Sequence, residues 1–223
     1  MRRTIAKASL LTALNLVFFA LIGTALLAIT YQLTHDPIAR SEEIEKLKLI
    51  AQIAPAGSYN NDIIKDTAQL APDALLGNDD TTPAYLGRIN GRLSIVVMQV
   101  IAPDGYGGNI HMVIAVRSDG RIAGVRVVSD KETPGLGDYV EIAKSRWITG
   151  FDGKSLDNPD GGGWKVKKDG GTFDYMAGAT ITPRAVVKAV HKALQYFAQH
   201  RETLFQAHAT ATESVQKNKG ENQ

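Results

Sequence analysis

Cysteine is absent from this sequence of 223 residues. Without a thiol, the chain forms no disulfide, no CxxC redox pair, no cysteine zinc site and no thiolate-ligated iron–sulfur cluster. The histidines at 111, 191, 200 and 208 do not share a spacing suited to haem or metal ligation, so we expect no metal site. Any redox chemistry of this chain therefore has to come from an organic cofactor.

A cluster of basic side chains is also missing. The chain has 25 Lys and Arg, but three of them, Arg2, Arg3 and Lys7, lie at the N-terminus and leave 22 against 23 Asp and Glu. A nucleic-acid-binding protein needs its cations gathered on one face in order to neutralise phosphates. We therefore expect no nucleic-acid partner.

Charge is missing from residues 10–29, LLTALNLVFFALIGTALLAI. A helix of this length spans a hydrocarbon core of roughly 30 Å, which predicts a single transmembrane anchor over residues 10–30. A cleaved signal peptide is the alternative, although its apolar region normally has only ~7 to 15 residues and no A-x-A site follows here. Because the three cations precede the segment, we expect residues 1–9 in the cytoplasm and the remainder outside it.

After the anchor, the pattern predicts an α+β domain with a mainly antiparallel sheet. Asp36 is a suitable N-cap and Pro37 a suitable first residue for a stalk helix within residues 31–54. Residues 55–87 are rich in turn formers and predict loops with short helical or strand pieces. Three successive antiparallel strands are predicted for RLSIVVMQVIA, NIHMVIAVRS and RIAGVRVVSD, which are rich in Val and Ile and separated by turns.

Helices and a further hairpin are expected to complete the domain, which we place at residues 55–200. The segment GDYVEIAKSRWITGF predicts a helix on the sheet, and WKVKKDGGTFDYM predicts a hairpin that turns at residues 169–171. A last helix over residues 183–200 aligns Val186, Val190, Leu194 and Phe197 on one face. The polar residues 201–223 predict a disordered tail.

A loop of small residues and two threonines, GATIT at 178–182, leads into this last helix. With Thr182 as N-cap and Pro183 as first residue, the N–H groups and the positive end of the helix dipole point toward the loop. Such a helix start suits a phosphate, and Gly178 and Ala179 leave the backbone open to close approach. The lysine of a Walker loop is missing. A capped helix without a ligand also explains the pattern, so the loop alone does not decide.

Two further glycine-bearing loops, DGYGG at 104–108 and SDKETPGLGDY at 129–139, border the same sheet. The segments GYGG, DGRIAGVRVV, ETPGLG, WITGFDGK and DYMAGATITPRAVVKAV follow the order and spacing of the FMN-binding domain family. The chain resembles that family over about residues 90–197. The family includes the G subunit of the Rnf (Rsx) ion-translocating electron-transport complex and the C subunit of the sodium-pumping NADH:quinone oxidoreductase. With its compact length, short anchor and stalk, the chain is most similar to the Rnf subunits.

The resemblance implies that FMN is esterified through its phosphate to the threonine of an S/T-G-A-T motif. Carried over to this sequence, that threonine is Thr180, and Asp174 is the acidic residue that a flavin transferase recognises. The chain departs from the motif at Ala177, where the family usually has Ser or Thr. Thr182 is the rival acceptor, but its hydroxyl is expected to serve as the helix cap.

The resemblance also implies where the flavin lies. The ring is expected against the ETPGLG loop, bonded by the N–H groups of Thr133, Gly135, Leu136 and Gly137. Gly178, Ala179 and Thr182 would surround the phosphate. Trp147 either stacks on the ring or belongs to the core, and Lys131 and Glu132 are expected to be solvated.

The implied function is electron transfer through a tethered FMN, with no other substrate. The complex would couple electron flow between NADH and ferredoxin, or a redox regulator, to H⁺ or Na⁺ movement. Implied partners are other subunits of a bacterial inner membrane complex, including a second covalent-FMN subunit and iron–sulfur membrane subunits, and a flavin transferase for maturation. The domain would then be periplasmic. Two alternatives stay open: the C subunit of the sodium-pumping enzyme, and a non-redox anchored binding or scaffold domain.

Overall fold

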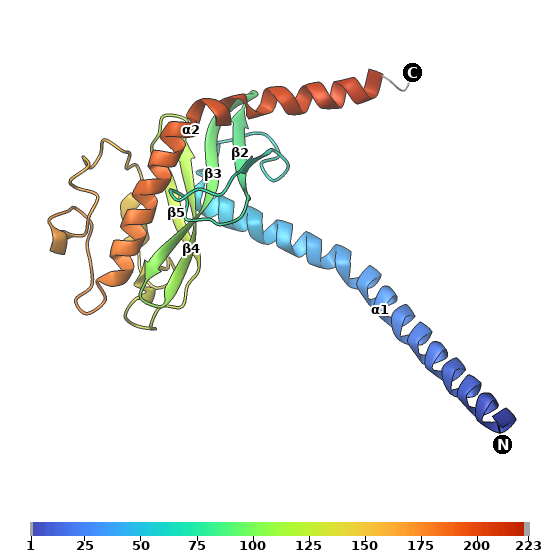
Figure 1. Cartoon of the computed structure of the whole chain (residues 1–223). Coiled ribbons are helices and arrows are strands. Elements are labelled where there is room, and N and C mark those ends of the chain that lie inside the picture. The colour runs from blue at the N-terminus through green and yellow to red at the C-terminus, as the bar shows by residue number, and fades with distance from the viewer. Residues whose placement is uncertain (1, 221–223) are drawn as a thin grey trace. The chain divides into compact units, whose positions relative to one another are not determined.

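The computed structural model describes the backbone of residues 2–220 and the side chains of residues 13–28, 30, 31, 44 and 47–206 (Figure 1). Met1 and residues 221–223 lie outside the described residues, as do the side chains of the three N-terminal cations on which the predicted topology depends. The chain divides into two units, Met1–Lys46 and Leu47–Gln223.

A single helix, α1, covers Arg2–Ile53 and supplies the whole described backbone of the first unit. The helix start predicted at residue 36 is not observed, because the backbone is helical through residues 36 and 37 and a proline removes only one bond from a helix ladder. The large apolar side chains of α1 between residues 14 and 27 are exposed. They include those at four successive positions, residues 16–19. No helix among the described residues combines the length and the apolarity needed to cross a membrane.

The last turns of α1 belong to the second unit and pack on the sheet. Ile50 and Ile53 are buried in one apolar cluster with residues of the strands. Gly124 makes this contact possible, since a Cβ there would lie 2.9 Å from the Cα of Ile53. A guanidinium N–H of Arg126 donates to the carbonyl of Gln52 at 3.0 Å, which satisfies one of the carbonyls left open at a helix end.

The second unit is built on a five-stranded antiparallel sheet in the order β1-β2-β3-β4-β5. The strands are β1 (Thr67–Leu70), β2 (Thr82–Ile89), β3 (Arg92–Gly105), β4 (Gly108–Arg117) and β5 (Ile122–Ser129). The three predicted strands are thereby confirmed as β3, β4 and β5. Side chains alternate between two apolar layers, with Val96 and Met98 on the side of the C-terminal helix and Ile95 and Val97 on the side of α1.

The C-terminal helix α2 (Ile181–Gly220) covers one face of the sheet (Figure 1). The predicted stripe is confirmed, because Val186, Val190, Leu194 and Phe197 are all buried. The helix is longer than predicted at both ends. Leu204, beyond the expected end at residue 200, is also buried, and the backbone stays helical to Gly220, where a disordered tail was predicted. Residues 201–220 contain many good helix formers, which explains why the helix continues without an apolar stripe.

Between β5 and α2 the chain is irregular, and two predictions for it are wrong. The helix expected over residues 137–151 is replaced by two short 3₁₀ helices, η1 (Asp138–Val140) and η2 (Trp147–Phe151). The Ser145 hydroxyl donates to the carbonyl of Tyr139 and accepts from the N–H of Trp147, which diverts the backbone between them.

The predicted hairpin is reduced to a single bridge between Val166 and Phe173 around η3 (Lys167–Asp169). Packing of the ring of Phe173 against those of Phe151 and Trp164 takes precedence here over strand pairing.

Candidate functional site

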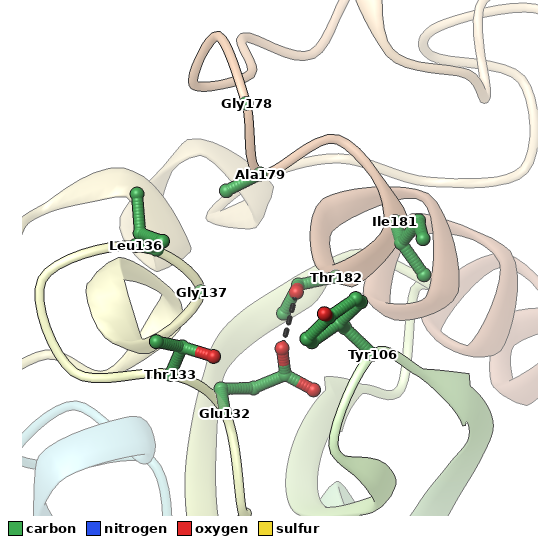
Figure 2. Close-up of a pocket in the computed structure, with 9 residues that line it drawn as sticks. All are labelled: Tyr106, Glu132, Thr133, Leu136, Gly137, Gly178, Ala179, Ile181 and Thr182. Atoms are coloured by element: carbon green, nitrogen blue, oxygen red, sulfur yellow. Dashed lines mark hydrogen bonds between the residues drawn. The ribbon is translucent and has the colours of Figure 1, made fainter.

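A pocket of about 280 Å³ opens where the β3–β4 turn, the loop after β5 and the start of α2 meet (Figure 2). Its lining residues are Tyr106, Glu132, Thr133, Leu136, Gly137, Gly178, Ala179, Ile181 and Thr182. The three glycine-bearing loops singled out in the sequence are thus brought to one place. The volume is close to the roughly 300 Å³ at which ligand pockets begin.

The N-terminus of α2 forms one wall of the pocket. The carbonyl of Thr180 accepts the first helical bond, from the N–H of Arg184 at 3.4 Å. Within the described residues no acceptor pairs with the N–H groups of Ile181 and Thr182, and both residues line the pocket. Two open donors at the positive end of the α2 dipole suit an anion such as a phosphate.

Thr182 does not have the predicted capping role. Since α2 begins at Ile181, Thr182 lies within the first turn and Thr180 is the residue that precedes the helix. The buried Thr182 hydroxyl donates to Oε2 of Glu132 at 2.5 Å (Figure 2). This bond links the start of α2 to the loop after β5.

Glu132 was expected to be solvated, and this prediction is wrong. Its side chain is only 7% exposed, whereas the neighbouring Lys131 is exposed. Besides the bond from Thr182, the carboxylate accepts the N–H of Gly107 at 3.0 Å. Oε2 of Glu132 lies only 2.4 Å from the position that a Cβ on Gly137 would take, so the glycines of GYGG and PGLG let the backbone close around the acid. Those glycines are the sequence signal that points to this buried group.

The loop after β5 turns on its own backbone bonds, which corrects another expectation. The N–H groups of Leu136 and Gly137 donate to the carbonyl of Thr133, at 3.0 and 3.1 Å. The N–H of Gly135 donates to the buried carboxylate of Asp138 at 2.8 Å. Three of the four N–H groups assigned to the flavin ring therefore already have partners. Gly135 does not line the pocket, whereas Thr133, Leu136 and Gly137 do.

Thr180 lies between two lining residues, Ala179 and Ile181, and is not itself a lining residue. It is 8% exposed, and its hydroxyl makes no hydrogen bond within the described part of the chain. The loop before it bends at Gly178, whose φ of +87° is a conformation that glycine adopts readily. A turn that bonds the N–H of Ala179 to the carbonyl of Met176 precedes it.

Neither Trp147 nor Asp174 lines the pocket, but a hydrogen bond between them fixes the path of this loop. The indole N–H of Trp147 donates to the carbonyl of Asp174 at 2.8 Å, while the ring packs edge-on against Tyr139 and Phe151. The Tyr139 hydroxyl accepts the N–H of Met176 at 3.2 Å. Burial raises the pKa of that hydroxyl, which is therefore neutral at physiological pH. The carboxylate of Asp174 is 73% exposed and pairs with Lys167.

The pocket residues fit a flavin mononucleotide. Tyr106, Leu136 and Ile181 expose 69%, 45% and 47% of their surface around the opening, which gives apolar area for a flat ring to cover. The open N–H groups of α2 provide for the phosphate, and Gly178 leaves room for it, with no atom near the position of a Cβ. Tyr106 and Ile181 were missed in the sequence, although an aromatic residue within a glycine-rich turn was a visible signal for the first.

Comparison with known proteins agrees with this assignment. Residues 105–195 match the FMN-binding domain family, and residues 1–53 match the RnfG N-terminal region. The chain is 50% identical over 198 residues to the G subunit of the ion-translocating oxidoreductase complex of Pseudomonas aeruginosa, covering 89% of this chain and 92% of the relative.

Two further relatives carry the same name. That of Aliivibrio fischeri is 44% identical over 204 residues, covering 92% of this chain and 95% of the relative. That of Shewanella oneidensis is 42% identical over 192 residues, covering 86% and 91%. At such identity over most of both chains, the chain belongs to the family of G subunits of ion-translocating oxidoreductase complexes.

Proposed function

We propose that this chain is the flavoprotein electron-transfer component, the G subunit, of an ion-translocating oxidoreductase complex, with FMN held at the pocket beside α2. The observation that carries this proposal is the meeting of open α2 N–H groups, Thr180 and an apolar-rimmed pocket within residues that match the FMN-binding domain family. The flavin supplies the electron-carrying chemistry, which the side chains of a chain without cysteine do not provide. The names of the relatives favour the G subunit over the C subunit of the sodium-pumping enzyme.

Covalent attachment at Thr180 is the finer part of the proposal. The Thr180 hydroxyl has no hydrogen-bond partner within the described residues and adjoins the start of α2, whereas the rival hydroxyl of Thr182 is engaged by Glu132. A phosphodiester keeps one negative charge, which a helix N-terminus stabilises by about 0.3 to 1 kcal/mol. Retention of the cofactor comes from the ester bond, since a tether replaces a concentration-dependent equilibrium by a fixed effective concentration. Ala177 lacks the hydroxyl that the family usually has at this position, but the proposed acceptor, Thr180, is present.

The remaining predicted site residues have distinct proposed tasks. Gly178, Ala179 and Thr182 lie where the phosphate would be, and Thr133, Leu136 and Gly137 form the wall against which the ring would lie. Gly135 and Trp147 act through the loops that they shape, since neither lines the pocket. Asp174 is exposed on the loop before Thr180, where a flavin transferase can reach it.

We also propose that residues 10–30 anchor the chain in the bacterial inner membrane. The uncharged segment and its exposed side chains support an anchor, and the preceding cations support a cytoplasmic N-terminus at residues 1–9. Residues 31–54 are then the stalk, residues 55–200 the periplasmic domain and residues 201–223 its polar tail. The proposed partners are other subunits of the complex, namely a second covalent-FMN subunit and iron–sulfur membrane subunits.

The attachment is tested by producing the full chain together with a flavin transferase, denaturing it and recording flavin fluorescence in a gel. Wild type is expected to fluoresce and Thr180→Val to be dark. Thr203→Val, an exposed threonine of α2 away from the pocket, is the matched control and should fluoresce like wild type. A dark wild type beside a positive control for the transferase would reject the proposal. Fluorescence that survives in Thr180→Val would move the attachment to another residue.

The topology is tested by cysteine labelling, which is clean because the chain has no cysteine of its own. In intact cells with a permeable outer membrane, a membrane-impermeant maleimide should label Thr203→Cys and leave Ser9→Cys unlabelled. Labelling of Ser9→Cys alone would reverse the proposed orientation.

A further inference from the structure

Glu132 is the only acidic or basic residue among the nine that line the pocket. Among the described residues, no Lys, Arg or His forms a salt bridge with it. Burying a carboxylate without a cation is unfavourable unless hydrogen bonds compensate for the lost water. A buried acid at the wall of a cofactor pocket therefore calls for a functional explanation.

The surroundings of Glu132 are built to hold a carboxylate. Each oxygen has one donor, the N–H of Gly107 for Oε1 and the hydroxyl of Thr182 for Oε2, which are 25 and 50 residues away in the sequence. Two donors on the two oxygens match the ionised form, which only accepts. A Cβ at Gly105 would lie 2.9 Å from Oε1, and one at Gly137 would collide with Oε2. Glycine at both positions therefore preserves the space that the carboxylate occupies.

We infer that Glu132 is an electrostatic positioning residue that makes the reduction potential of the bound flavin more negative. The inference rests on the proposed function, because it requires the flavin ring in this pocket. Each electron that enters the ring from the complex adds one negative charge unless a proton accompanies it. A fixed carboxylate at the pocket wall repels that charge, and water screens the repulsion less than at the surface because Glu132 is only 7% exposed. The oxidised flavin is therefore favoured relative to the same pocket without the charge.

Thr182 has a supporting part in this inference. Its hydroxyl donates to Oε2 and holds the carboxylate of Glu132 in place at the pocket wall. Without the hydroxyl, the carboxylate has one donor fewer and is free to turn toward water, which screens its charge and weakens the repulsion. Because Thr182 also lies in the first turn of α2, the charge of Glu132 is held at a fixed place relative to the proposed phosphate site.

The test is a redox titration of the flavin-loaded full chain, followed by its absorbance. Glu132→Gln keeps the shape and removes the charge. We expect a more positive midpoint potential, by about tenfold or more in the reduction equilibrium, which is ~30 mV for a two-electron couple. Thr182→Val should shift the potential in the same direction by less, and Thr182→Ser, which keeps the hydroxyl, should match wild type. Asp119→Asn removes the same charge from the exposed β4–β5 turn and should leave the potential unchanged.

The outcomes separate this inference from the proposed function. A wild type that carries no flavin defeats the proposed function. Flavin-loaded variants of Glu132 and Thr182 with the wild-type potential, or with a more negative one, defeat only the inference. If Glu132 were merely structural, its loss would lower the melting temperature without moving the potential, which would contradict the inference. Should Glu132→Gln fail to fold, the potential of Thr182→Val against Thr182→Ser decides in the same way.

Discussion

The sheet with α2 and the irregular segment between β5 and α2 are held together in different ways. In the sheet, each strand pairs with its neighbours along a ladder of residues, and successive apolar side chains are buried on both faces. In the segment, single contacts set the path, such as Asp138 with the N–H of Gly135 and the Trp147 indole with the carbonyl of Asp174. The pocket walls come mainly from the second kind of structure. Single substitutions should therefore disturb the site more readily than they disturb the fold.

Phe151→Ala should have the largest effect, because Phe151 belongs to both regions. It is fully buried, lies in the core with the sheet, and stacks on Phe173 with 4.7 Å between ring centroids. Truncating a buried phenylalanine costs about 3 to 5 kcal/mol of unfolding free energy. Urea denaturation should show this loss. Phe205→Ala, at a residue 37% exposed on α2, should cost less than ~1 kcal/mol, and equal losses in the two variants would contradict the assignment.

Asp138→Ala should have the next largest effect and should loosen the pocket wall itself. The buried carboxylate is the acceptor for the N–H of Gly135, and a buried donor left without its acceptor costs about 1 to 3 kcal/mol. Hydrogen exchange should accelerate at residues 135–137 before it does in β3 or β4. Lys144→Gln removes only the ion pair with Asp138. Because the Lys144 side chain is 53% exposed, this change should cost at most ~1 kcal/mol. Uniform acceleration across the sheet would show that the segment has no separate stability.

The structural features that could be predicted from the sequence lie mainly in the sheet and α2, and those that could not lie mainly in the irregular segment. Runs rich in Val and Ile between turns predicted β3, β4 and β5, and a 3.6-residue stripe predicted the docked face of α2, since both depend on neighbours in the sequence. The burial of Glu132 was not predicted, because it depends on Gly107 and Thr182, which are distant in the sequence. The path of residues 137–173 was missed for a similar reason, as rings such as Phe151 and Phe173 meet only in the folded chain. The glycine-bearing loops were placed correctly, and at Gly105, Gly107 and Gly137 a Cβ would indeed meet a neighbouring segment.

Tyr139→Phe should have a smaller and more local effect. The change removes the hydroxyl that accepts the N–H of Met176, at a cost of about 0.5 to 1.5 kcal/mol. It also changes the response to alkali. Since burial raises the pKa of Tyr139, the folded state holds its proton longer than the unfolded state, and stability is lost as the pH rises above about 10 through the folded value. The variant should lose less stability over this range.

Tyr196→Phe is the control for this prediction. Burial also raises the pKa of Tyr196, but this residue lies on α2, and the bond to Met176 comes from Tyr139. Both variants should flatten the alkaline dependence of stability, whereas only Tyr139→Phe should speed hydrogen exchange at Met176. Unchanged exchange at Met176 in Tyr139→Phe would mean that the loop does not depend on this bond.

His191 offers the smallest effect, at the junction of the two regions. Its ring on α2 stacks on Trp164 of the irregular segment, with centroids 5.0 Å apart and planes 3° from parallel. Burial lowers the pKa of His191, so the folded state takes up its proton later than the unfolded state on acidification. Its contribution to stability is therefore present above about pH 6.5 and is lost as the pH falls through the folded value.

His191→Phe keeps the stacked ring without the titration. Between pH 7.5 and 5, urea denaturation should show a smaller loss in this variant than in wild type, because carboxylates contribute alike to both. Equal losses of unfolding free energy would mean that protonation of His191 does not weaken its stacking on Trp164.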